Sequence, residues 1–291
     1  MIPRFSLVRP HTLDEALAAF EATGGDAAYL AGGTELLQVM KLGFAQIGTL
    51  IDVKRVPDLK GIERRPDGWL RLGAAVTHRE IERSELVRHE LPALAGLELH
   101  LANARVRNAG TIGGNLAFAE PHSDPATFLL ACGATVLLAS PSGRRELPID
   151  EFVVGPLFTA READEVMISV QVPPAAAGEG RSYDKLAFFE RPAASVAVRL
   201  TVRDGAITAA TVAVGSVGPA PTLVAGAAEA LLGADAEGDG LEAAVTAASG
   251  ALAHVEAEAD LNGSADYKRH LAAVLLRRAV AAAIREAQAD A

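Results

Sequence analysis

The sequence predicts an α+β protein with a longer N-terminal part and a separate C-terminal domain. Short helix and strand patterns alternate up to Val172–Gly180 (VPPAAAGEG), which is rich in proline, glycine and alanine. Beyond it, three strand patterns are followed by three alanine-rich helix patterns. A chain of 291 residues is long enough for two domains. We expect them at residues 1–175 and 179–291, with the first divided into subdomains at about 1–55 and 56–175.

The first subdomain is predicted to run helix, strand, helix and strand. The expected elements are Thr12–Thr23, Ala27–Ala31, a helix over Glu35–Lys41, and Ile47–Val53. Thr12 and Glu15 form a capping-box pattern at the first helix. Gly32 and Gly33 allow a sharp turn after the strand, and Thr34 is placed to cap the helix that follows.

The second subdomain is predicted to mix helices with a hairpin and buried strands. After the turn-rich Pro57–Gly68, the expected elements are a strand at Trp69–Leu72, one helix from Thr77 through Leu91, helices at Leu94–Leu101 and Pro125–Gly133, hairpin strands at Ala134–Ala139 and Arg144–Pro148, and a strand at Val166–Val172. Thr77 and Glu80 repeat the capping-box pattern.

The C-terminal domain is predicted to be a three-stranded antiparallel sheet with a three-helix bundle. Its strands are expected at Arg181–Phe189, Ser195–Arg203 and Ile207–Val217, and its helices at Thr222–Leu232, Gly240–His254 and Ala265–Ala289. Arg203-Asp204-Gly205 suits a tight hairpin turn, and Ser264 is a candidate N-cap for the last helix.

Composition excludes several classes of function. The formal charge of −10 argues against nucleic acid or an anionic membrane as a partner. No apolar run is long enough for a signal peptide or a membrane span, so we expect a cytoplasmic protein without a membrane span. A single cysteine, Cys132, cannot ligate an iron–sulfur cluster, and the seven histidines have no HExxH spacing. We therefore predict no metal in this chain.

Two glycine clusters are the main candidates for a binding site. They lie within Asp26–Gly43 (DAAYLAGGTELLQVMKLG) and Arg107–Asp124 (RNAGTIGGNLAFAEPHSD). A glycine turn that opens a helix presents unpaired N–H groups to an anion, although an isolated pair of glycines is as often a plain turn. The P-loop pattern is absent, and the GxGxxA match at Gly238–Ala243 has no strand before it. Two separate clusters favour an extended anionic ligand such as a dinucleotide pyrophosphate.

Ala31–Leu37 (AGGTELL), Thr111–Asn115 (TIGGN) and Ser123-Asp124 resemble the flavin-binding motifs of the FAD-binding medium subunit of molybdenum hydroxylases. This family includes the xanthine dehydrogenase and aerobic carbon monoxide dehydrogenase types. The resemblance also covers Phe5–Ala16, Val154–Pro173, Tyr183–Ser195 and Tyr267–Ala279. It implies an FAD-binding domain of the PCMH type, FAD as cofactor, and an oxidoreductase that transfers electrons. It also implies two partners, a molybdenum-cofactor large subunit and a [2Fe-2S] small subunit.

The resemblance also implies which residues bind FAD. They are Ala31, Gly32, Gly33, Thr34, Glu35, Leu36, Thr111, Gly114, Asn115, Ser123, Asp124, Met167 and Lys185. The first motif would hold the pyrophosphate, with Glu35 acting through its backbone. Asp124 would bind a ribose or ribityl hydroxyl, and Lys185 would stabilise charge at the isoalloxazine edge.

Simpler roles for several of these residues stay open. Asp124 could be the N-cap of the helix at Pro125, and Lys185 a solvated strand lysine. Met167 could be ordinary core. Lys41 fits the C-terminal end of its helix better than a phosphate site, and His122 could be a loop histidine without a chemical role.

Two features depart from the family pattern. Gly33 stands where the xanthine dehydrogenase branch has an asparagine, which favours the carbon monoxide dehydrogenase-like branch. Glu120-Pro121-His122 replaces smaller residues before Ser123. The electron acceptor therefore stays open between NAD, a quinone and oxygen. Two other functions also stay open, a stand-alone flavin-dependent oxidoreductase and a fold relative that has lost FAD.

Overall fold

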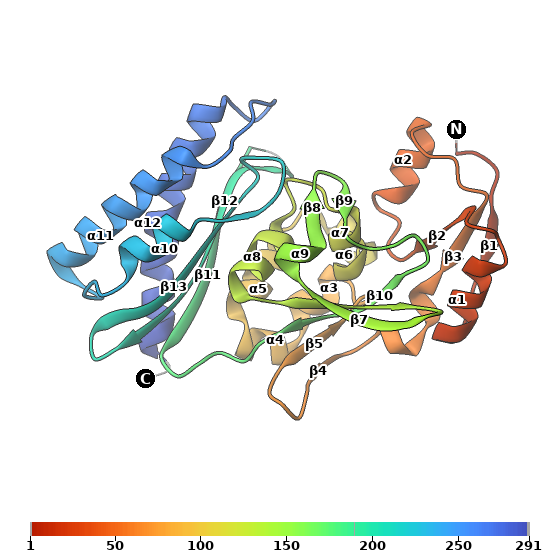
Figure 1. Ribbon diagram of the computed structural model, residues 1–291, viewed down its shortest axis with the longest axis horizontal. Helices are drawn as coiled ribbons and strands as arrows, with labels where there is room; N and C mark the ends of the chain where they lie inside the picture. The colour runs from red at the N-terminus through yellow and green to blue at the C-terminus, as the bar shows by residue number, and fades with distance from the viewer. Residues whose placement is uncertain (1, 189, 290–291) are drawn as a thin grey trace.

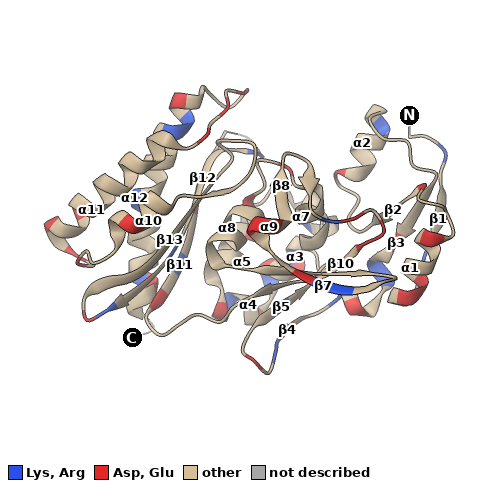
Figure 2. Cartoon of the chain, in the orientation of Figure 1, with Lys and Arg blue, Asp and Glu red and all other residues tan. Residues whose placement is uncertain are grey.

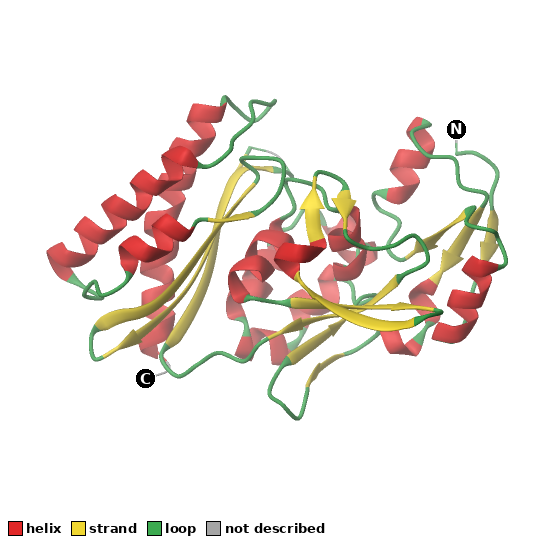
Figure 3. Ribbon diagram, in the orientation of Figure 1, coloured by secondary structure: helices red, strands yellow, loops and turns green. Residues whose placement is uncertain are grey.

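The computed structural model describes residues 2–188 and 190–289. The three larger sheets follow one another along the long axis of the molecule, with the N-terminal sheet at one end and the C-terminal sheet with its long helices at the other (Figure 1). Helices cover the sheets and strands of both directions occur, which confirms the α+β class (Figure 3).

The N-terminal sheet is parallel, in the order β1-β3-β2. Its elements are β1 (Ser6–Val8), α1 (Leu13–Glu21), β2 (Ala27–Leu30), α2 (Leu36–Leu42) and β3 (Thr49–Asp52). The Thr12 hydroxyl accepts a hydrogen bond from the Glu15 N–H at 3.1 Å, which confirms that cap. Strand β1 was not predicted, because it is short and exposed and so lacks a buried apolar pattern.

The middle sheet is antiparallel, in the order β4-β5-β10-β6-β7. Its strands are β4 (Ile62–Arg64), β5 (Leu70–Gly73), β10 (Val166–Val172), β6 (Thr135–Ser140) and β7 (Gly143–Pro148). Every residue of the central strand β10 is buried, so both of its faces are covered. It carries no charged residue, whereas the edge strand β7 carries several (Figure 2).

Short helices surround the middle sheet. In chain order the elements are the 3₁₀ turns η1 (Val53–Arg55) and η2 (Pro57–Leu59), α3 (His78–Arg83), α4 (Glu85–Glu90), α5 (Pro92–Leu99), α6 (Ala104–Ala109), α7 (Ile112–Phe118), α8 (Asp124–Cys132), α9 (Ile149–Phe152), and the hairpin β8 (Val153–Gly155) and β9 (Phe158–Thr159). The capping box of Thr77 and Glu80 is confirmed. The prediction of one helix through Leu91 was wrong, because Ser84 is extended and its hydroxyl caps the N-terminus of α4.

The C-terminal domain forms an antiparallel sheet in the order β11-β12-β13-β14. Its elements are β11 (Glu179–Ala187), β12 (Pro192–Arg203), β13 (Ala206–Gly215), β14 (Thr222–Leu223), α10 (Ala225–Leu231), α11 (Gly238–Ala251), η3 (Leu252–His254) and α12 (Ala265–Ala289). The fourth strand, β14, occupies the predicted start of the helix at Thr222, so α10 begins later than expected. Phe189, the last residue of the predicted first strand, lies outside the described residues.

The C-terminal sheet is covered by helices from both parts of the chain. Helix α12 packs on β11 and β12, and α8 packs on β12 and β13. Figure 1 shows these two helices on opposite sides of the sheet. All nine residues of α8 are buried, because this helix separates the middle sheet from the C-terminal one. Over the residues that the structure describes, no helix is both long and apolar enough to cross a bilayer.

Candidate functional site

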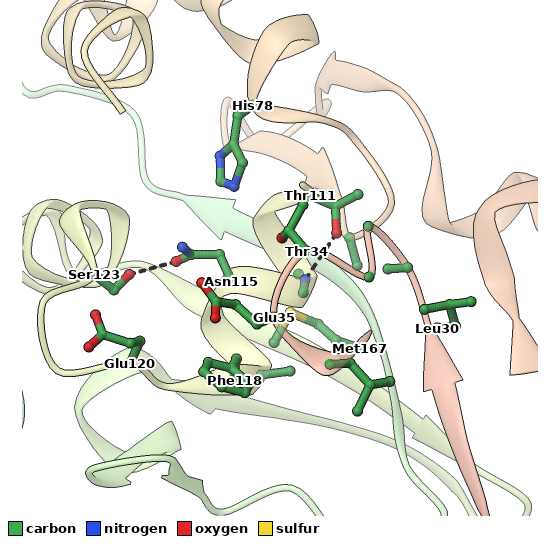
Figure 4. A pocket seen from close by; sticks show the side chains of 18 of the residues that line it. Leu30, Thr34, Glu35, His78, Thr111, Asn115, Phe118, Glu120, Ser123 and Met167 are labelled. Atoms are coloured by element: carbon green, nitrogen blue, oxygen red, sulfur yellow. Dashed lines mark hydrogen bonds between the residues drawn. The ribbon is translucent and has the colours of Figure 1, made fainter. Parts of the chain in front are cut away.

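A cavity of about 400 Å³ lies where the N-terminal unit, the helices of the middle sheet and the start of the C-terminal domain meet. It is lined by all the predicted site residues except Lys185. The two glycine clusters, far apart in the sequence, therefore form one site (Figure 4). Its size falls within the range of ordinary ligand pockets.

The first glycine turn touches the second directly. A Cβ atom on Gly32 would lie 2.4 Å from the Ala109 carbonyl oxygen and 2.6 Å from the Gly110 Cα, so only glycine fits there. Gly33 has φ +70°, a conformation that residues with a Cβ rarely adopt. The first glycine is thus required by space and the second by backbone conformation.

Thr34 does not cap the following helix, contrary to the prediction. Helix α2 begins at Leu36, with Glu35 at the N-cap position and no side-chain capping bond. Because Thr34 lies in the turn before the helix, its hydroxyl has no described hydrogen-bond partner and lines the cavity. Figure 4 shows that the Glu35 side chain also extends across the cavity, toward Asn115.

The second turn is fixed by a capped helix. The Thr111 hydroxyl accepts a hydrogen bond from the Gly114 N–H at 3.1 Å and is the N-cap of α7. The Ser123 hydroxyl donates to Asn115 Oδ1 at 2.6 Å. Among the described residues, none bonds to the Asn115 amide nitrogen, so this group is available as a donor to a ligand.

Asp124 and Lys185 form a buried ion pair. Lys185 Nζ lies 2.5 Å from Asp124 Oδ2 and also donates to the His100 carbonyl at 3.1 Å. The Tyr183 hydroxyl donates to Asp124 Oδ1. The alternatives of a helix N-cap and a solvated lysine were both wrong, since Ser123 is the N-cap and the Lys185 side chain is only 14% exposed.

Burial is the main cause of the pKa shifts of Asp124 and Tyr183. Burial raises the pKa of Asp124, with the Lys185 charge acting in the opposite direction. Burial and the neighbouring Asp124 raise the pKa of Tyr183 well above its usual value, so Tyr183 stays a neutral donor. Asp124 lines the cavity although it is only 4% exposed.

Met167 reaches the cavity from the central strand β10, although it is almost fully buried. The neighbouring Ile168 accepts a backbone hydrogen bond from Ala74 at 2.8 Å and does not line the cavity. Lys41 lies in the last turn of α2, as expected, and outside the cavity lining.

Several cavity residues were missed from the sequence. At the side of the N-terminal unit, Tyr29 donates to the Asp164 carbonyl at 3.0 Å, and burial raises its pKa to about 12. Arg161 lines the same side and donates to the carbonyls of Glu162 and Glu165. Burial lowers the pKa of this guanidinium. No local motif marks these residues, because their partners are remote in the sequence or are backbone groups.

At the opposite side, His122 connects the cavity to the C-terminal domain. Its Nδ1 lies 3.1 Å from Glu120 Oε1, and its Nε2 lies 2.8 Å from Asp260 Oδ2. Lys268 Nζ also binds Asp260, at 2.7 Å, and Arg191 binds Glu120 at 3.3 Å.

These contacts set the charges of the cluster. The hydrogen bond to Glu120 raises the pKa of His122, and that to Asp260 adds to the effect against the opposing influence of burial. Burial would raise the pKa of Asp260, but the hydrogen bond from Lys268 holds it well below its usual range. His122 therefore has a structural role that the sequence did not reveal.

Comparison with known families identifies the architecture. Residues 3–175 match the family model described as the FAD binding domain in molybdopterin dehydrogenase, and residues 190–283 match the CO dehydrogenase flavoprotein C-terminal domain. The chain belongs to the family of FAD-binding medium subunits of molybdopterin dehydrogenases. This confirms the family resemblance, and with it FAD as the cofactor and an oxidoreductase subunit as the class of protein.

Members of this family match over nearly the full length. The chain is 37% identical to the carbon monoxide dehydrogenase medium chain of Hydrogenophaga pseudoflava, over 97% of each. It is 32% identical to the nicotine 6-hydroxylase medium subunit of Paenarthrobacter nicotinovorans, over 96% of this chain and 97% of that one. A solved structure of the Hydrogenophaga pseudoflava enzyme superposes with a TM-score of 0.92, covering 98% of this chain and 99% of that chain at 37% identity.

The cavity of this family member fits FAD by its own chemistry. A pyrophosphate needs close backbone approach, and Gly32 and Gly33 leave the first turn without side chains. The Thr34 hydroxyl and the Asn115 amide add side-chain polar groups at the lining. Apolar residues such as Met167 complete walls suited to aromatic rings.

Proposed function

We propose that this chain is the electron-transfer subunit of a molybdenum hydroxylase complex. It would receive electrons from a [2Fe-2S] small subunit, while a molybdenum-cofactor large subunit oxidises the substrate. The flavin would then pass the electrons to an external acceptor. Support comes from the full-length similarity to medium chains and medium subunits of carbon monoxide dehydrogenase and nicotine 6-hydroxylase.

The observation that carries this proposal is the contact between the two glycine turns, which encloses one cavity lined by both predicted motifs. When bound there, FAD supplies a carrier that exchanges electrons singly or in pairs. The first turn, Ala31–Leu36, would hold the cofactor through backbone N–H groups and the Thr34 hydroxyl. Thr111 and Gly114 would shape the opposite wall, and Asn115 would donate its amide.

The charged residues near the second turn would tune the cofactor. Ser123 fixes the Asn115 amide through its hydrogen bond, so that the NH₂ group points to the ligand. Lys185 neutralises Asp124 and places a fixed cation behind the cavity wall. We propose that this pair sets the local field that the flavin experiences. We also propose the domain limits 1–175 and 179–291, and the cytoplasmic location stays a prediction.

The partner role is tested by purifying the tagged full chain from its own cells. We expect bound FAD and two co-purifying chains, one with iron and acid-labile sulfide and one with molybdenum. Chemical reduction of the iron–sulfur chain should then reduce the flavin of the complex. A chain that purifies alone and oxidises an organic donor without partners would overturn the proposal in favour of a stand-alone oxidoreductase.

A further inference from the structure

A buried histidine–glutamate pair, whose histidine lines the cavity, belongs to neither glycine motif. His78 is the first residue of α3, and its Nδ1 lies 2.8 Å from Glu98 Oε2 on α5. His78 is 2% exposed and Glu98 is fully buried. Helix capping by Thr77 and the backbone bond from His78 N–H to the Gly110 carbonyl, at 3.1 Å, hold the ring in place.

The ring of His78 lies at the junction of the two glycine turns. A Cβ on Gly110 would lie 3.1 Å from His78 Cδ2 and 3.5 Å from Nε2, so the ring packs against this residue. The position of a Cβ on Gly32 is also in contact with Gly110. The backbone of Gly110 is thus approached by the first turn and by the histidine ring.

The Nε2 atom is the polar end of this ring that remains for a ligand. His78 lines the cavity, and Figure 4 shows its ring pointing into the space bounded by Thr34, Thr111 and Asn115. Nδ1 makes the bond to Glu98, and among the described residues none hydrogen-bonds to Nε2. A carboxylate that holds one nitrogen of an imidazole ring fixes the direction in which the other nitrogen points.

The buried carboxylate behind the ring favours an N–H donor at Nε2. Glu98 Oε1 is buried without a hydrogen-bond partner in the described part of the chain, so a net negative charge there would be uncompensated. An anionic ligand beside this carboxylate would be repelled unless a hydrogen-bond donor stood between them, and Nε2 is the ring atom in that position.

We infer that His78 is a direct cofactor-binding residue, whose Nε2–H donates to a phosphate oxygen of FAD, and that Glu98 is its positioning residue. The inference rests on the proposed placement of the pyrophosphate at the two glycine turns. It assigns a donor that neither glycine motif contains.

The test compares FAD binding by the full chain with that of single variants. His78→Phe keeps a ring but removes the donor, and we expect FAD affinity to fall about tenfold or more. His78→Gln, which keeps an amide N–H near the Nε2 position, should recover part of this loss. The control, His89→Phe, replaces an exposed histidine outside the cavity and should bind FAD like the unaltered chain. Affinity is measured by titration of FAD fluorescence.

A second measurement separates contact with phosphate from a structural effect. At saturating FAD, the ³¹P resonances of the pyrophosphate should shift in both His78 variants and in Glu98→Gln, but not in His89→Phe. Unchanged affinity and unchanged ³¹P resonances in the His78 variants would overturn the inference while leaving FAD binding intact. If His78→Phe does not fold, as judged by circular dichroism, the His78→Gln spectrum decides. Failure of the unaltered chain to take up FAD would overturn both this inference and the cofactor site.

Discussion

The two glycine turns line one cavity but are built in different ways. The first, at Gly32 and Gly33, lies in the small N-terminal unit before a short helix that no side chain caps. The second lies in a helix capped by Thr111, and a Cβ on Gly113 would lie 2.5 Å from the Ala74 Cβ. The second turn is therefore part of the core of the middle sheet, whereas the first belongs to the N-terminal unit and packs against Ala109 and Gly110. Substitutions near the second turn should therefore lower the stability of the fold, and substitutions in the first turn should mainly lower the affinity for FAD.

The largest loss of stability is expected from breaking the buried ion pair that follows the second turn. Lys185→Met leaves the Asp124 carboxylate buried without its cation, and we expect the free energy of unfolding to fall by about 3 kcal/mol. Burial already raises the pKa of Asp124, and loss of Lys185 would raise it further. The penalty applies above that pKa and should shrink as the pH falls through it. Denaturant unfolding at several pH values measures both effects.

The matched control for this pair is Lys185→Met combined with Asp124→Asn. Removing the carboxylate charge together with its cation should restore most of the lost stability, because no charge is then left buried. If the double variant is no more stable than Lys185→Met, the pair is not the cause of the loss.

A smaller change in stability, of opposite sign at the two positions, is expected when either of two helical glycines is replaced by alanine. Gly113→Ala should destabilise the protein by about 2 kcal/mol, because its Cβ would meet Ala74 backbone and side-chain atoms at under 3 Å. Gly96→Ala in α5 meets nothing within 4 Å and should stabilise it by up to about 1 kcal/mol. Thermal unfolding of the two variants compares them directly. Equal melting temperatures would contradict the assignment of the second turn to the core.

A substitution in the first turn should lower FAD affinity more than it lowers stability. Gly33→Ala adds about 1 kcal/mol of backbone strain at φ +70° and crowds Leu30 and Leu37, so FAD affinity should fall more than global stability. Gly43→Ala also has a positive φ, +85°, but lies outside the cavity in open space. It should carry a similar strain without loss of FAD affinity. FAD titrations of the two variants check this. If both bind FAD equally well, Gly33 does not belong to the FAD site.

The smallest effect concerns His122, which ties the loop after the second turn to the C-terminal domain. Its pKa is raised from 6.5, so the stabilisation by its protonated form is complete below about that pH and is lost as the pH rises through the raised value. We expect this contribution to be about 1 kcal/mol or less, because the cluster is partly exposed. His122→Gln should flatten the pH dependence of stability over that window. A slope equal to that of the unaltered chain would show that another group titrates.

Much of the fold could be predicted because local signals decided it. The hairpin at Asp204 and Gly205 has both residues at positive φ, as its sequence indicates, and the Ser264 hydroxyl caps α12 by accepting from the Tyr267 N–H. Elements that depend on remote partners were missed. Strand β1 is three exposed residues that pair with β3 some forty positions later, and β14 is a two-residue addition to the edge of β13.

The same distinction holds at the site. The glycine motifs could be found because their residue types and spacing are local. His78 could not, because its partner Glu98 is on another helix and its neighbour Gly110 follows a third. The alternative of a solvated Lys185 was wrong for the same reason, since Asp124 is remote in the sequence. A histidine directly after a capping threonine, at the end of a predicted buried strand and turn, was the one local signal available.

The position of β10 has a consequence for synthesis of the chain. This strand is made last among the five of its sheet, yet it lies between β5 and β6, and Ser169 pairs with Gly73 far upstream. At roughly 5–20 residues per second, a ribosome takes seconds to reach β10 after β5 has emerged. During that interval β5 and β6 each present an unpaired edge that another chain could join. The edges of β5 and β6 therefore stay open to intermolecular pairing until Val172 has left the ribosome. A chain released earlier would be an aggregation-prone fragment.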